Sequence, residues 1–135
     1  MATTEERLIV REDSNKGSAP VAAGVKIPGG TLVFAIAAGF ATNVVNAGAN
    51  TLLGVAHNTA DNAGGANGDE IIEFWRREKF QFTLAGVTQA DLNKKVYAID
   101  NDTLTLTAAN HTYVGTIAEI VDGNTVMVDL DPLAQ

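Results

Sequence analysis

The chain contains no cysteine and few of the side chains that enzymes use most often. Without cysteine there can be no disulfide, thiolate zinc site or thiol nucleophile. Among its 135 residues are two histidines and two serines, and both serines, Ser14 and Ser18, lie near the N-terminus. A serine nucleophile needs a rigid and oriented base, which these positions do not favour. We therefore expect a protein that is not an enzyme, with no catalytic residues, no metal and no cofactor.

Positive charge is also scarce, because nine lysines and arginines stand against sixteen acidic residues, for a net charge of −7. A nucleic-acid-binding protein needs a basic face that releases counterions, so we expect no nucleic-acid partner. No apolar run is long enough to span a bilayer, and we expect no membrane partner. The first seven residues lack the basic start and apolar run of a secretory signal. This favours a protein that is made and used without export.

The residues that are present predict one all-β domain. The length suits a single domain, and 46% of the residues are hydrophobic, which is enough for a core. Short β-branched and aromatic runs alternate with glycine, asparagine and aspartate, as strands alternate with turns. The predicted strands cover residues 31–36, 43–45, 51–57, 71–75, 79–84, 96–99, 103–107 and 125–130. Only Thr88–Asp91, which resembles a capping box, favours a single helical turn.

The N-terminal residues differ from the rest of the chain. Residues 12–20 are polar and rich in residues that avoid regular structure, so we assign residues 1–20 to an extended arm and 21–135 to the single β domain. Within the arm, an apolar patch carries the candidate partner-binding residues Arg7, Leu8, Ile9 and Val10. The arm is either a frayed terminus or a segment that orders on a partner.

The most informative feature is an internal repeat. Residues 23–25 recur at 85–87, residues 33–36 at 96–99, and residues 51–56 at 112–117, with offsets of 62, 63 and 61. Two copies are too few for a solenoid, so we expect two β-motifs that close on each other as a small barrel or sandwich with pseudo-twofold character. Gly54 and Gly115 interrupt strand patterns, which predicts a bulge or a close backbone approach. The loop 58–69 has no counterpart in the second copy, and its small residues predict a surface position.

Two pairs of residues are candidates for a metal site or a subunit interface. Asp100 and Asp102 could bind calcium weakly, but an Asp/Asn turn is the preferred interpretation. Phe74 and Trp75 are adjacent in a predicted strand, so their side chains face opposite sides. One of them enters the core, and the other is a candidate subunit-interface residue, because aromatic side chains are favoured interface anchors.

The order of these motifs resembles that of a known family. Residues 22–25, 30–33, 53–56, 95–97, 113–118 and 126–130 follow one another as in the small decoration, or cement, proteins of tailed-bacteriophage heads. The resemblance covers about residues 20–131. It implies a structural protein of the virion exterior, assembled in the host cytoplasm, which binds the major capsid protein and stabilises the capsid, often as a homotrimer. It implies neither catalysis nor a cofactor. The arm, with Arg7 to Val10, would then contact the capsid or a neighbouring subunit.

Two other functions remain open. The first is a carbohydrate-binding or adhesin-like β module that uses Trp75 and the loop 58–69. The second is a hydrolase that uses the carboxylates of Asp100 and Asp102, which we rank last.

Overall fold

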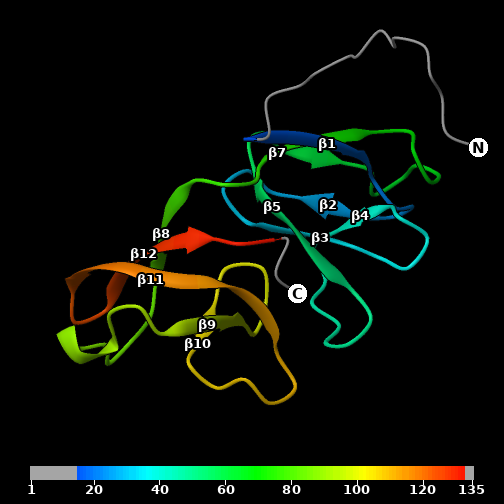
Figure 1. Cartoon of the computed structure of the whole chain (residues 1–135). Coiled ribbons are helices and arrows are strands. Elements are labelled where there is room, and N and C mark those ends of the chain that lie inside the picture. Colours follow the sequence, from blue (N-terminus) through cyan, green and yellow to red (C-terminus); the bar gives the residue numbers. More distant parts are fainter. Residues whose placement is uncertain (1–14, 133–135) are drawn as a thin grey trace, which may run out of the picture.

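The computed structural model describes residues 15–132, which form twelve β-strands and one 3₁₀ turn, η1 (Figure 1). The predicted all-β class is therefore confirmed. The first half contains β1 (Lys16–Pro20), β2 (Lys26–Ile27), β3 (Leu32–Ala35), β4 (Ala41–Thr42), β5 (Thr51–Ala56), β6 (Ala60–Asp61) and β7 (Ile71–Trp75). The second half contains β8 (Lys79–Thr83), η1 (Gln89–Asp91), β9 (Lys95–Ala98), β10 (Leu104–Thr105), β11 (Thr112–Asp122) and β12 (Thr125–Leu130).

The internal repeat is visible in the strand order. One five-stranded sheet has the order β1-β7-β5-β3-β4, and the other has the order β8-β12-β11-β9-β10. All neighbouring strands within each sheet are antiparallel. Each strand of the first sheet thus has a counterpart at the same place in the second. Among the strands of residues 15–132, only β2 and β6, which pair with each other, have no counterpart.

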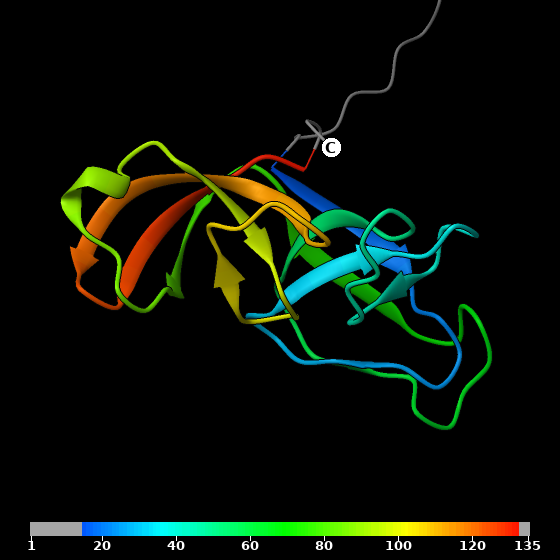
Figure 2. The same ribbon diagram turned by 90° about the horizontal axis from the view of Figure 1, so that it is seen from below.

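Each sheet curls into a small barrel, because its two edge strands meet. A parallel bridge joins Val21, just after β1, to Ala41 in β4, and another joins Thr83 in β8 to Thr103, just before β10. We call the first-half unit barrel 1 and the second-half unit barrel 2. They lie side by side in both views (Figures 1 and 2).

The two repeat glycines lie at equivalent close approaches between strands. The pairing register shifts beside each glycine. In barrel 1 the shift lies between Val33 and Phe34 of β3, opposite Gly54 of β5, and in barrel 2 it lies between Tyr113 and Gly115 of β11. A Cβ on Gly54 would overlap the carbonyl oxygen of Trp75, and one on Gly115 would overlap that of Asp129. The predicted bulge and close backbone approach are therefore confirmed in both copies.

The hydrophobic core shows that the barrels pack asymmetrically. Inside barrel 1, one cluster is formed by Val21, Ile27, Val33, Ala41, Ala56, Ala60, Ile72 and Phe74. The larger cluster combines the apolar residues of barrel 2 with four residues of β3 and β5, namely Leu32, Phe34, Leu52 and Val55. Their repeat counterparts in barrel 2 are Lys95, Tyr97, Tyr113 and Thr116, which are exposed or half-buried. The barrels thus bury non-equivalent faces, which corrects the expected pseudo-twofold packing.

Three local predictions need correction. Residues 43–45 are not a strand, since β4 ends at Thr42, and Val44 is 54% exposed. The threonine-rich run 103–107 contributes only the two residues of β10. The loop 58–69 is only partly a surface loop, because it contains β6 and the fully buried Asn62.

The start of the domain also lies earlier than the composition suggested. Residues 16–20, which we assigned to the arm, form β1 and pair with β7. Hydrogen bonds from Arg76 N to Asn15 O and from Val21 N to Glu70 O show that the backbone N–H and C=O groups of the odd-numbered residues of β1 point toward β7. Pro20, which has no N–H, therefore points its nitrogen away from β7 and costs the sheet no hydrogen bond. The apolar patch with Arg7, Leu8, Ile9 and Val10 lies outside the described residues.

Candidate partner-binding surface

The outer face of β7 carries the aromatic side chain that the sequence singled out. Ile72 and Phe74 enter barrel 1, where Phe74 is only 5% exposed, whereas Ile71, Glu73 and Trp75 face outward. The prediction that Phe74 and Trp75 face opposite sides, with one of them in the core, is confirmed. Phe74 is therefore a core residue of barrel 1, and the candidate interface role falls to Trp75, whose side chain is partly exposed.

Three polar side chains surround Trp75, and with it they form what we call the tryptophan patch: Lys16, His57, Glu73 and Trp75. The His57 ring meets the indole edge to face, with centroids 4.8 Å apart and planes at 83°. Lys16 Nζ lies 4.6 Å from the indole centroid, a cation–π contact worth about 0.5–1 kcal/mol at an exposed site. His57 Nδ1 is 3.9 Å from Glu73 Oε2.

The β-sheet brings these side chains together from distant parts of the chain. Lys16 in β1 and Val55 in β5 both pair with Trp75, so the indole lies over the middle of a three-stranded face. His57 follows β5 directly, and its backbone N–H donates to Glu73 O. The indole is thus held in place before any partner arrives, which lowers the entropy lost on binding.

The described part of the chain begins beside this patch. Lys16 is the first residue of β1, and the carbonyl oxygen of Asn15 accepts a 2.7 Å hydrogen bond from Arg76 N, next to Trp75. The described residues of the predicted arm, from Asn15 on, therefore begin beside Trp75 on the folded domain.

A second aromatic surface lies on barrel 2, and the sequence analysis missed it. The rings of Tyr97 and Tyr113 pack edge to face at 5.9 Å, and Lys95 Nζ lies 5.9 Å from the Tyr113 centroid. Burial, and then the negative charge of Asp131, raise the pKa of the Tyr113 phenol. Both tyrosines occupy repeat positions at which barrel 1 has the apolar residues Phe34 and Leu52, and this difference between the two copies was the signal available in the sequence.

The carboxylate of Asp100, which together with Asp102 was considered for calcium binding and hydrolysis, stabilises a turn. Asp100 Oδ1 accepts hydrogen bonds from the backbone N–H groups of Asp102 at 3.0 Å and Thr103 at 2.8 Å. The Asp102 hydrogen bond is the main reason why the pKa of Asp100 is lowered. The preferred turn interpretation is confirmed. Within residues 15–132 no group of three or more histidine, aspartate or glutamate side chains is placed to hold a metal ion.

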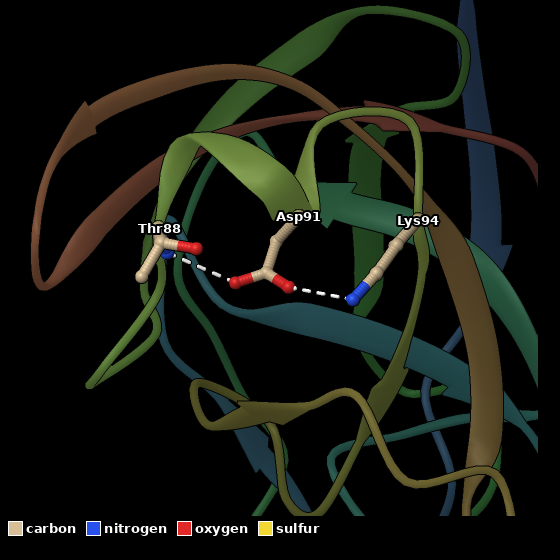
Figure 3. Close-up of polar contacts among 3 residues, drawn as sticks. All are labelled: Thr88, Asp91 and Lys94. Carbon is tan, nitrogen blue, oxygen red and sulfur yellow. Dashed lines mark hydrogen bonds and ion pairs between the residues drawn. The ribbon is translucent and has the colours of Figure 1, made fainter.

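A second carboxylate stabilises η1 (Figure 3). Asp91 Oδ2 accepts a hydrogen bond from Thr88 N at 2.9 Å, and Asp91 Oδ1 lies 2.8 Å from Lys94 Nζ. The hydrogen bond with Lys94, followed by that with Thr88, lowers the pKa of Asp91. The helical turn predicted at Thr88–Asp91 is thus confirmed, and its polar groups serve the fold of barrel 2.

A hollow of about 530 Å³ lies where β8 and β10 meet in barrel 2. It is lined by Thr83, Leu84, Ala85, Asp102, Thr103, Leu104, Thr105, Leu106 and Thr107. Its walls mix leucine side chains with threonine hydroxyls.

Comparison with known proteins gives no match, since no family model, no curated protein and no solved structure is significantly similar to this chain. Among residues 15–132, no helix has the length and apolar character needed to cross a bilayer.

Proposed function

We propose that this protein is a decoration protein, which binds the outer surface of a tailed-phage head through the major capsid protein and stabilises the capsid as a homotrimer. The observation that carries the proposal is the position of the tryptophan patch at the start of β1, where the described part of the chain begins. A segment preceding β1 that binds a partner would begin beside this ordered aromatic anchor, so one domain would contact a protein surface at two adjacent points. The resemblance of the motif order to decoration proteins supports the choice of partner.

The energetics favour such a two-part contact. Burying Leu8, Ile9 and Val10 would contribute about 1.5–3 kcal/mol for each side chain. Ordering the backbone costs about 1–2 kcal/mol per residue, so one segment alone binds weakly. Trp75 adds contact area that is already ordered, because Lys16 and His57 hold its ring. A trimer presents three such contacts and gains further through effective concentration.

The test is co-sedimentation with purified phage heads that lack their decoration protein. We expect W75A to weaken binding at least ten-fold and deletion of residues 1–14 to abolish it. The deletion stops at Ser14 because β1 begins at Lys16. V121A is the matched control, since Val121 is 53% exposed on barrel 2, away from the tryptophan patch, and this variant should bind normally.

Wild-type binding by both W75A and the truncated protein would refute the two-part contact. Light scattering of the free protein measures its mass, and the mass of a single chain would contradict the homotrimer.

A carbohydrate-binding module is the second candidate, because Trp75 is partly exposed beside the hydrogen-bonding groups of Glu73 and His57. A sugar would stack on the indole face over which Lys16 lies, and it would have to displace that side chain. This competition favours a protein partner. Glycan-array binding that is lost in W75A would reverse the order of the two candidates.

A further inference from the structure

The loop 58–69 contains the single Asn-Gly pair of the sequence, Asn67–Gly68. Such a pair is chemically labile, because glycine has no side chain to keep its backbone nitrogen away from the amide carbon of the preceding asparagine. Both residues are exposed, so water has access to them. The pair is therefore a candidate site for a spontaneous covalent modification.

The modification is deamidation through a cyclic imide. Gly68 N loses its proton and attacks Asn67 Cγ, and the side-chain nitrogen of Asn67 leaves as ammonia. Water then opens the imide at either of its carbonyl carbons, which gives aspartate or isoaspartate at this position. The reaction consumes water, releases ammonia and needs no oxidant, reductant or enzyme. It does require that Gly68 N is free and can approach Asn67 Cγ.

The folded domain engages both reacting groups in hydrogen bonds. Gly68 N donates to Val21 O at 2.9 Å, and Asn67 Oδ1 accepts a hydrogen bond from Ala23 N at 2.8 Å. The proton that Gly68 must lose is thus held against a carbonyl oxygen. The hydrogen bond at Oδ1 polarises the Asn67 amide, but this activation has no effect while the attacking nitrogen is engaged. The backbone rotation that would bring the nitrogen to Cγ would break these bonds.

The buried side chain of Asn62 anchors this part of the loop. Its amide donates to Val21 O at 3.2 Å and to Ala22 O at 3.0 Å, both in the segment that follows β1. The same amide donates to Ala66 O at 2.9 Å. Ala66 and Gly68 are therefore both fastened to that segment, one on either side of the reactive amide. Loss of the Asn62 amide should release the pair.

We propose that Asn67 is a deamidation site whose reaction is controlled by opening of the loop 58–69. In the closed loop Gly68 N is engaged, and the reaction is slow. Local opening, which costs less free energy than global unfolding, frees the nitrogen. Because the loop recloses faster than the amide reacts, the observed rate is the rate of the unfolded chain multiplied by the fraction of open loops. The hydrogen bonds of the Asn62 amide set that fraction.

The test is peptide mapping by mass spectrometry of the full-length chain after incubation at neutral to mildly alkaline pH. We expect the native chain to form aspartate and isoaspartate at Asn67 at least ten-fold more slowly than the chain unfolded in guanidinium chloride. Folded N62A should react at least ten-fold faster than the folded wild type. N124A is the matched control, because Asn124 is an exposed asparagine in the β11–β12 turn of barrel 2, and this variant should react at the wild-type rate.

Equal deamidation rates in the native and the unfolded wild-type chain would overturn the proposal, and so would a wild-type rate in folded N62A. Circular dichroism verifies the fold of each variant. Hydrogen exchange of the Gly68 amide in the wild type provides a second criterion that needs no variant. We expect this amide to exchange at least ten-fold more slowly in the native chain than in the unfolded chain, because Val21 O holds its proton. Exchange at the unfolded rate would show that the loop is open and would refute the control by closure.

Discussion

Replacing Gly54 or Gly115 with alanine should destabilise the fold strongly, because each glycine lies directly against the backbone of a neighbouring strand. The added Cβ of G54A would overlap the carbonyl oxygen of Trp75 and lie 3.0 Å from Phe74 Cδ2. In G115A it would overlap the carbonyl oxygen of Asp129 and lie 3.2 Å from Leu130 Cα. In both variants the strands must move apart, since a sheet backbone cannot rotate away as a flexible side chain can.

The size of the loss follows from overpacking. Extra carbon atoms in a packed region typically cost about 1–3 kcal/mol, and a clash with backbone belongs at the upper end, about 3 kcal/mol. For a domain of this size each kcal/mol lowers the melting temperature by about 3–5 °C, so we expect a drop of roughly 10 °C. Since domains are typically stable by about 5–15 kcal/mol, both variants should still fold.

Thermal and urea unfolding, followed by circular dichroism, measure the effect. The control is G123A, because no atom lies within 4 Å of its added Cβ and its φ is not in the left-handed region. This variant should be neutral or more stable by up to about 1 kcal/mol. A melting temperature of G54A or G115A within about 2 °C of the wild-type value would refute the close-approach argument.

Three further substitutions test other parts of the structure. N62A should lower the free energy of unfolding, measured in urea, by about 2–4 kcal/mol, because the Asn62 amide donates to three backbone carbonyls. N67A removes one exposed hydrogen bond and should lower the free energy of unfolding by under about 1 kcal/mol. F34A should lower the free energy of unfolding by about 3–5 kcal/mol, whereas Y97A, at the half-buried equivalent position of barrel 2, should lower it by only about 1 kcal/mol. Equal losses in the two variants would contradict the asymmetric packing. Because the pKa of Asp91 is lowered from its ordinary 3.8, its contribution to stability is present above that pH and is lost as the pH falls through the lowered pKa. Melting temperatures of D91N should therefore depend less on pH below 4 than those of the wild type, and identical profiles would contradict this role.

Local sequence patterns predicted much of the fold. Alternation of apolar and polar residues predicted the strand over residues 79–84, which the structure gives as 79–83, and the two-residue period of a strand placed Phe74 and Trp75 on opposite faces. The repeated motifs predicted two related units, and the glycines within them predicted the close approaches at Gly54 and Gly115. These features depend on the two-residue period of a strand and on the size of one side chain, so neighbouring residues suffice to reveal them.

The tertiary structure decided what depends on residues far apart in the chain. The sequence alone determined an all-β domain of two units, but only long-range pairing showed which face each unit buries, so that Phe34 is buried while its counterpart Tyr97 is half-exposed. The burial of Asn62 depends on carbonyl groups forty residues away. The tryptophan patch likewise exists only because the sheet places Lys16 of β1 beside Trp75 of β7. Such contacts leave no local pattern, because they are set by how the sheets curl and pack.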